Sequence, residues 1–460
     1  TNGEFACTAD GYYIIVESAL TGEDASMTYH LLGTYDADKG ADISVKASKP
    51  SVVKKVKENV KYTEDDGFGA GYNDVADYSK GDMVPFRLIA TLPSDIDIYG
   101  DYYIKYTDTL EAGFVAPETI TVTVDGAADT SFDVTITNGT GTADEGNIKV
   151  TVTGDTNIVV EVFNVQKYKP AQGSLSATTV TVDYEAKFDT DAVVGRPGNY
   201  NDVYLTYSNN PNVMGEGSSK DENDEYKAPE EKDLGETDKD GVVVFTYQLD
   251  VYKYDAADTN KNLLAGAEFV LSNKDGAYLG TDAKGAYTWL TLDDVTDVEA
   301  YDWADAGVNV YTSTTADVIS IPGLDDGTYF LTEIKAPSSA YNLLDAPLEL
   351  VISATTDNGQ EHDAIGPNTA TDARTGKQLT EIKLTEDTDT HDTNNDAQDD
   401  TVGGKVLTAG NVQIMVSNSS GAQLPGTGGI GTTLFYLGGG AMVAVAGIYL
   451  ISKKRMKNEE

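Results

Sequence analysis

The sequence predicts an all-β protein, built from β-sandwich domains in tandem and followed by one C-terminal transmembrane helix. Short runs rich in Val, Thr and Tyr recur along the chain between Gly, Asp and Asn residues, a composition typical of strands and turns. Residues 434–451 form a long run without a charge. At about 1.5 Å per helical residue, ~18 residues span a ~30 Å hydrocarbon core. A chain of 460 residues also has room for two or three domains.

The charge balance excludes one large class of function. The chain carries 76 acidic against 32 basic residues, for a net charge of -44. Nucleic-acid binding requires a basic surface, so we expect no nucleic-acid partner. The single cysteine, Cys7, allows no intrachain disulfide, and the three histidines show no metal-ligand spacing. We therefore predict neither a metal nor a cofactor.

Strand-like runs divide the chain into four segments. Residues 1–48 contain too few of them for an independent sandwich. In residues 49–246 the runs have the spacing and alternation of an immunoglobulin-like sandwich, and they cover residues 50–56, 84–93, 102–110, 119–124, 133–136, 158–162, 179–184 and 203–207. A second sandwich is expected over 247–421, with a strand at 242–255 opening it and one at 411–418 closing it. The membrane segment belongs to residues 422–460.

Strand parity places three polar side chains inside the second sandwich. Lys253, Glu333 and Asn418 each continue the apolar stripe of a strand, because alternate residues share a face. Burial lowers the pKa of a lysine and raises that of a carboxyl group, which favours both neutral forms. A neutral amine can attack the Asn amide while the protonated Glu polarises the carbonyl and moves a proton. The alternative is an ion pair between Lys253 and Glu333, with Asn418 capping its strand.

The same parity rule marks three residues of the first sandwich. Lys54, Asp108 and Asn201 lie on the apolar faces of the strands at 50–56, 102–110 and around 203–207. Lys55 is the neighbouring alternative for the amine, and Asn199 shares the face of Asn201. The alternative interpretation makes these lysines exposed residues at the entrance of a domain.

The C-terminal end contains a motif with a defined order of parts. Leu424-Pro425-Gly426-Thr427-Gly428 precedes the apolar run, and Lys453-Lys454-Arg455 follows it. By the positive-inside rule the basic cluster stays in the cytoplasm and the bulk of the chain lies outside. The arrangement resembles the LPxTG sorting signal of Gram-positive bacteria. The resemblance implies that a sortase thiol attacks the Thr427 carbonyl, expels Gly428 onward and passes the acyl group to an amine, so that the chain is a substrate and not an enzyme.

Two further segments resemble domains of Gram-positive pilins. Residues 247–421 resemble the B-type repeat of collagen adhesins, through the runs 249–253, 264–269 and 323–337 and the strand that ends at Asn418. This implies an amide bond between Lys253 and Asn418, promoted by Glu333. Residues 50–246 resemble the fimbrial isopeptide-formation D2 domain, through the runs 50–56, 106–110 and 198–211.

The resemblance to the D2 domain implies a second amide, between Lys54 and Asn201, with Asp108 as the promoting acid. Residues 1–48 resemble the end of the N-terminal domain of a backbone pilin. The expected function is a structural subunit of a covalent pilus, exposed on the cell surface, anchored in the cell wall and membrane-bound before sorting. Its expected partners are sortase, identical subunits and peptidoglycan.

A polymerising subunit also needs an exposed lysine as acceptor amine. The Val-Tyr-Pro-Lys context of the family is absent here. Lys46 and Lys49 are the nearest candidates, with Lys46 as the main one, and the run at 164–169, which contains Lys169, is a weaker candidate. The alternative is that all of them are ordinary surface lysines. The alternative function is a monomeric wall-anchored adhesin that binds a host protein or glycan.

Overall fold

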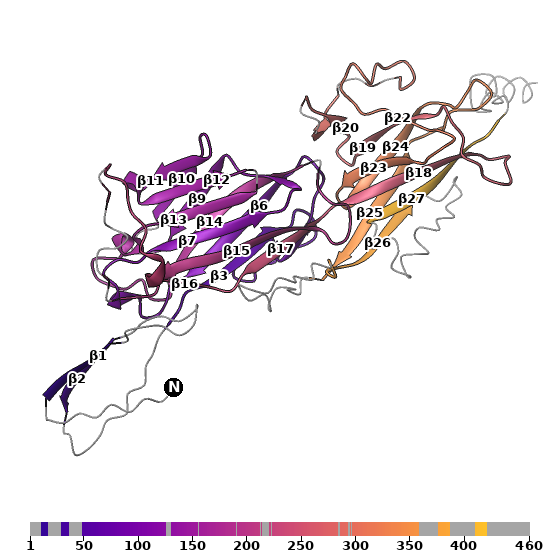
Figure 1. Cartoon of the computed structure of the whole chain (residues 1–460). Helices are drawn as coiled ribbons and strands as arrows, with labels where there is room; N and C mark the ends of the chain where they lie inside the picture. The colour runs from indigo at the N-terminus through magenta and orange to yellow at the C-terminus, as the bar shows by residue number, and fades with distance from the viewer. Residues whose placement is uncertain are drawn as a thin grey trace, which may run out of the picture.

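In the part of the chain that the structure describes, the regular secondary structure is β-strand apart from short 3-10 helices, so the predicted all-β fold is confirmed. The computed structural model describes residues 11–16, 29–35, 48–125, 130–154, 156–189, 191–211, 213, 220–221, 223–283, 286–292, 295, 297–357, 376–386 and 410–420. A two-stranded antiparallel sheet near the N-terminus consists of β1 (Gly11–Val16) and β2 (Tyr29–Tyr35). Two sandwiches follow it (Figure 1).

The first sandwich contains two sheets packed face to face. One sheet has the spatial order β10 (Thr130–Thr135), β9 (Thr119–Val124), β14 (Thr179–Phe188), β6 (Met83–Thr91), β3 (Ser51–Lys57) and β4 (Tyr72–Asn73), with β8 (Phe114–Val115) paired to β14. The other has the order β11 (Thr140–Ala143), β12 (Ile148–Thr153), β13 (Asn157–Val162), β7 (Ile104–Leu110), β15 (Asn199–Ser208), β17 (Asp240–Phe245) and β5 (Val75–Asp77), with β16 (Leu234–Glu236) paired to β15. Short 3-10 helices cover Ile96–Ile98, Asp144–Gly146, Val165–Tyr168 and Glu231–Asp233.

The second sandwich is smaller and has one sheet of three strands. These are β23 (Ile319–Leu324), β18 (Tyr247–Asp255) and β27 (Asn411–Asn418), and β18 and β27 run parallel. The facing sheet has the order β21 (Tyr287–Leu290), β20 (Tyr278–Thr281), β19 (Glu268–Asn273), β24 (Gly327–Lys335), β25 (Leu348–Thr356) and β26 (Leu379–Glu386), with β22 (Tyr311–Thr312) paired to β19.

Alternating burial along the strands forms the core of each sandwich. On β6, for example, the buried residues are Val84, Phe86, Leu88 and Ala90, while their neighbours are partly exposed. This period of two places one face of each strand against the opposite sheet, which is where the apolar side chains escape water. Each sandwich has its own large cluster of buried apolar residues.

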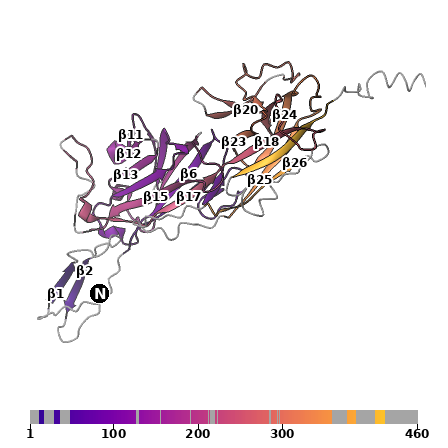
Figure 2. The ribbon, with the colours of Figure 1, turned by 45° about the vertical axis from the view of Figure 1, so that its right-hand side comes forward.

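The two sandwiches lie end to end (Figures 1 and 2). The chain crosses between them at Thr246, the one residue between β17 and β18. The single strand predicted over residues 242–255 is therefore wrong, because it divides at this residue into β17 and β18. The Thr246 hydroxyl donates a hydrogen bond to the Leu324 carbonyl, at 3.1 Å. Tyr200 and Val75, which belong to strands of the first sandwich, pack into the core of the second. The junction is therefore a packed interface.

Several predicted features lie outside the described residues. They are the sorting motif at 424–428, the apolar run at 434–451 and Lys46. Within the part of the chain that the structure describes, no helix is long and apolar enough to cross a membrane.

The close approach of the sandwiches gives a test at Gly81. This residue has a φ of +97°, and a Cβ placed on it would lie 2.1 Å from the Tyr287 carbonyl oxygen of the second sandwich. Gly81→Ala should lower the free energy of unfolding by about 1–3 kcal/mol through overpacking, beyond the backbone strain. Gly67, with a φ of +95° and nothing within 4 Å of its Cβ position, is the matched control. Equal losses for both variants in urea unfolding would contradict a tight junction.

Candidate functional site

Lys54, Asp108 and Asn201 come together between the two sheets of the first sandwich. Lys54 lies on β3 in one sheet, whereas Asp108 and Asn201 lie on the neighbouring strands β7 and β15 of the other. All three side chains are fully buried. The Lys54 Nζ donates to the Asp108 Oδ2 at 2.7 Å. Lys54 is therefore not an exposed lysine at a domain entrance.

A fourth residue, Tyr184 on β14, lies in the middle of this set. Its hydroxyl donates to the Asp108 Oδ2 at 2.6 Å and accepts a hydrogen bond from the Asn201 Nδ2 at 2.7 Å. The Lys54 Nζ also donates to the Tyr184 hydroxyl oxygen, at 3.3 Å. Tyr184 continues the inward stripe of the predicted strand at 179–184, but the sequence does not distinguish it, because a tyrosine in such a stripe is most often a packing residue.

Burial controls the charge states at this site. Loss of solvent lowers the pKa of the Lys54 amine, although Asp108 acts in the opposite direction. Loss of solvent also raises the pKa of the Asp108 carboxyl group, and Lys54 opposes that shift. Both desolvation effects favour a neutral amine beside a neutral acid, the forms that nucleophilic attack on an amide requires.

The two alternative residues have other partners. The Lys55 amine forms an ion pair with Asp74 at 2.5 Å, and it lies over the ring of Phe68. The Asn199 amide donates to the backbone carbonyls of Val193 and Val244. Neither residue contacts Asp108 in the described structure, so the geometry favours Lys54 and Asn201.

Lys253, Glu333 and Asn418 form a corresponding set in the second sandwich. Lys253 and Asn418 lie on the parallel neighbours β18 and β27, and Glu333 reaches them from β24 in the facing sheet. All three side chains are buried. The Asn418 Nδ2 donates to the Glu333 Oε2 at 2.9 Å, and the Lys253 Nζ lies 4.0 Å from the Glu333 Oε1. The Lys253 Nζ donates to the Val416 carbonyl at 3.2 Å.

Burial shifts the pKa values of the lysine and the acid in this second set in the same directions as in the first. Burial lowers the pKa of Lys253 to about 8, against an opposing effect of Glu333. Burial also raises the pKa of Glu333, while the hydrogen bond from Asn418 lowers it. The acid therefore already contacts the amide nitrogen that would leave, and a larger share of the Lys253 amine is neutral at physiological pH than for an ordinary lysine.

The two sites share a pattern of unsatisfied oxygen atoms. Within the described structure, one carboxyl oxygen of each acid and the amide oxygen of each asparagine are buried without a hydrogen-bond partner; they are Asp108 Oδ1, Asn201 Oδ1, Glu333 Oε1 and Asn418 Oδ1. A buried polar atom without a partner costs about 1–3 kcal/mol, so both sets are under-satisfied as they stand. A proton on each acid would supply a donor.

The candidate acceptor lysines differ in position. Lys49 is exposed and precedes β3. Lys169 is also exposed, but its amine forms an ion pair with Asp97 at 2.5 Å. Lys46 lies outside the described residues.

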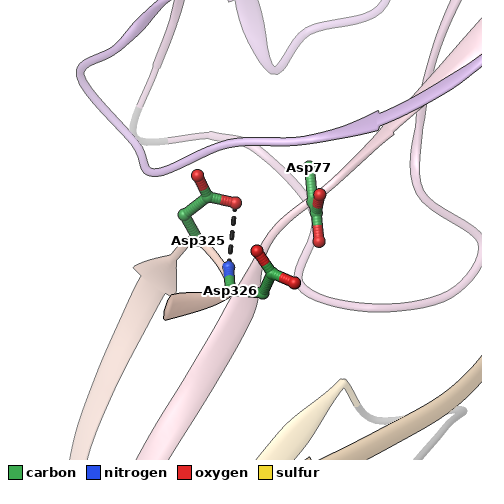
Figure 3. Close-up of side chains that lie close together, drawn as sticks. All are labelled: Asp77, Asp325 and Asp326. Carbon is green, nitrogen blue, oxygen red and sulfur yellow. Dashed lines mark hydrogen bonds between the residues drawn. The ribbon is translucent and has the colours of Figure 1, made fainter. Parts of the chain in front are cut away.

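A group of carboxylates lies at the junction of the sandwiches. Asp77 belongs to the first sandwich and Asp325 and Asp326 to the second, and one oxygen of each lies within 4.8 Å of the others (Figure 3). The Lys61 amine pairs with Asp77 at 3.3 Å and with Asp326. Since this amine supplies the positive charge, we describe the group as an ion-paired junction and assign no metal to it.

Comparisons with known proteins match two parts of the chain to families. Residues 248–363 match the SpaA family, a prealbumin-like fold domain. Residues 416–460 match the LPXTG cell wall anchor motif. The chain is also 23% identical over 385 residues to the trypsin-resistant surface T6 protein of Streptococcus pyogenes serotype M6. That match covers 76% of this chain and 64% of the relative, so the chain spans less than two thirds of the relative's length.

One solved pilin structure shares the fold of this chain. The T6 backbone pilin of serotype M6 Streptococcus pyogenes superposes with a TM-score of 0.50 at 16% identity, over 90% of this chain and 82% of that one. The pilus 2b backbone protein of group B streptococcus gives a TM-score of 0.43 at 20% identity, over 76% and 97% of the two chains. The chain thus resembles the T6 surface protein in sequence and shares the predicted sandwich fold with the T6 backbone pilin, and the wall-anchor match confirms the predicted location in the Gram-positive cell wall.

The carboxylates of the junction predict a pH-dependent stability. Burial, followed by the charge of Glu58, raises the pKa of Asp77 to about 7, and burial with the charge of Asp77 raises the pKa of Asp325 well above its ordinary value. A carboxyl group whose pKa is raised by folding holds its proton more tightly in the folded state. It therefore adds its full contribution to the free energy of unfolding below its ordinary pKa of 3.8, and this contribution is lost as the pH rises through about 7. The urea concentration at the unfolding midpoint should therefore decrease as the pH is raised from about 5 to about 8, measured in buffer that contains EDTA.

The variant Asp77→Asn should flatten this dependence, because it removes one of the groups that must ionise. Glu349→Gln removes an exposed carboxylate of the second sandwich and should leave the slope unchanged. A wild-type midpoint that rises over the same pH range would contradict the assignment.

Proposed function

We propose that the chain is a structural subunit of a covalently assembled Gram-positive pilus, fixed to the cell wall by sortase and stabilised by intramolecular Lys–Asn isopeptide bonds. One observation carries the proposal. Each sandwich holds a fully buried set of lysine, acid and asparagine, in a chain that ends in a wall-anchor motif. The relative named as a surface protein and the shared fold of the backbone pilins support it.

The chemistry is a condensation within each sandwich. A neutral amine attacks the amide carbon of the asparagine, and the product is a secondary amide together with one ammonia. Lys253 joins Asn418 with Glu333 as the acid, and Lys54 joins Asn201 with Asp108 as the acid. The amide is uncharged, so it removes the cost of keeping an ionisable amine in the core.

The positions of the bonds explain a mechanical function. In the second sandwich, tension enters at the start of β18 and leaves at the end of β27, and these strands are parallel neighbours. A Lys253–Asn418 amide carries the load directly from one strand to the other. The Lys54–Asn201 amide does the same between β3 and β15 of the first sandwich. The strands inside both loops then carry no tension.

Assembly uses the two ends of the proposed subunit. Sortase cleaves after Thr427 of the Leu424-Pro425-Gly426-Thr427-Gly428 motif and links its acyl group to an amine. For subunits inside the fibre we propose that this amine is Lys46 of the next identical subunit, and at the base it belongs to peptidoglycan. The proposed modules are residues 49–246 and 247–421, between an N-terminal segment and the sorting signal at 422–460.

Intact mass of the purified full-length chain tests the bonds. The wild type should be lighter than its sequence by two ammonias, and its tryptic digest should contain both branched peptides. Glu333→Gln and Asp108→Asn should each lose one branched peptide, because each removes the acid of one site. Glu349→Gln, which neutralises an exposed carboxylate, should retain both. A wild-type mass equal to the sequence mass would refute the bonds.

Denaturing gels of cell-wall extracts test the assembly. In a host with its sortases, Lys46→Arg should abolish the ladder of covalent multimers and preserve wall anchoring, since it keeps the charge but removes the acceptor amine. Thr427→Ala should abolish both. A ladder that persists in Lys46→Arg and disappears in Lys49→Arg or Lys169→Arg would move the acceptor. Wild-type protein that is anchored but never forms a ladder would favour the monomeric adhesin.

A further inference from the structure

The two proposed condensation sites differ in how the acid reaches the asparagine. In the second sandwich the Glu333 carboxylate contacts the Asn418 nitrogen directly, at 2.9 Å. In the first sandwich no described hydrogen bond joins Asp108 to Asn201. The side chain of aspartate is one methylene shorter than that of glutamate. The hydroxyl of Tyr184 lies between the acid and the amide, at 2.6 Å from one and 2.7 Å from the other.

These contacts form a continuous line of proton donors and acceptors. It runs from the Lys54 Nζ to the Asp108 Oδ2 at 2.7 Å, then to the Tyr184 hydroxyl, and from there to the Asn201 Nδ2. The line connects the nitrogen that must lose a proton with the nitrogen that must gain one. All of it is buried, with Tyr184 at 5% exposure. Burial and the Asp108 charge raise the pKa of Tyr184 well above its ordinary value, so the phenol keeps its proton.

We propose that Tyr184 is a catalytic residue of the Lys54–Asn201 condensation and delivers the proton that the departing nitrogen requires. The inference rests on the proposed bond. The amine lone pair attacks the Asn201 Cγ and the Nζ–Cγ bond forms. The neutral Asp108 gives its proton to the Tyr184 oxygen while the phenol O–H turns to the Nδ2 and gives its own, and the carboxylate that Asp108 becomes takes a proton from the Nζ. The Cγ–Nδ2 bond breaks and ammonia leaves, so Tyr184 and Asp108 end unchanged.

The chain provides a matched control for this role in Tyr106. This tyrosine lies on β7, the strand of Asp108, and is fully buried. Its hydroxyl donates to the Val180 carbonyl at 2.6 Å, and no described hydrogen bond joins it to Lys54, Asp108 or Asn201. Tyr106→Phe therefore removes a buried hydroxyl from the same core without interrupting the line of proton transfer. The Lys253–Asn418 bond provides an internal reference within each molecule, because it does not use Tyr184.

The experiment is a time course of bond formation in the full-length chain during cell-free synthesis. Samples are quenched in denaturant and digested, and each branched peptide is measured against its linear forms. In Tyr184→Phe the Lys54–Asn201 peptide should form about 10²-fold more slowly, the usual contribution of general acid–base catalysis. The Lys253–Asn418 peptide should form at the wild-type rate in the same samples, which shows that synthesis and folding of the second sandwich are unchanged in the variant. Tyr106→Phe should form both at wild-type rates.

A double variant distinguishes proton delivery from packing. Asp108→Glu combined with Tyr184→Phe extends the acid by one methylene and should restore a large part of the lost rate. A folded double variant as slow as Tyr184→Phe would overturn the claim that Tyr184 extends the reach of Asp108.

The remaining outcomes separate this inference from the proposed function. If the wild type forms the branched peptide and Tyr184→Phe forms it equally fast, the role of Tyr184 is refuted and the bond stands. If the wild type never forms the Lys54–Asn201 peptide, the bond is refuted and the inference fails with it.

Discussion

In both sandwiches a lysine amine lies beside a carboxyl group, with no solvent around either. The free energy of such a pair depends on desolvation more than on attraction, because removal of two charges from water costs several kcal/mol for each ion. Placing them between two sheets requires partners from both sheets, which is what β3 with β7 and β18 with β24 provide. The opposed sheets of each sandwich are thus fixed relative to one another at a polar point.

An amide at these points changes the thermodynamics as well as the mechanics. Each proposed bond closes a loop of well over a hundred residues, which in the loop-entropy treatment of cross-links stabilises the folded state by about 4–5 kcal/mol. It also replaces an ionisable amine with an uncharged group in the core. The junction has the opposite character. Its carboxylates come from both sandwiches and remain titratable, so the stability of the contact between the modules depends on pH. Inside each proposed module, the amide has replaced the lysine amine that could titrate.

Much of this arrangement could be predicted from the sequence, because period-two burial is a local property. The alternation around Lys54 and Lys253 indicates which side each amine occupies, and the structure places both inside. Parity says nothing about which side chains meet across the gap between sheets. Tyr184 was missed for that reason, since its contacts come from three other strands. The carboxylate group at Asp77 and Asp325 was missed because a strand end and a turn of different sandwiches form it, and no periodic pattern extends across such a contact.

The parallel pairing of β18 and β27 has a further consequence. Residues 256–318, which lie between β18 and β23, include the short strands β19 to β22 and their connecting turns. With the proposed amide in place, cleavage of a peptide bond in any of these turns would leave both fragments covalently joined through Lys253 and Asn418. The fibre would keep its length after such a cut. These turns are then free to accept insertions and to diverge in sequence, since the continuity of the polymer does not pass through them.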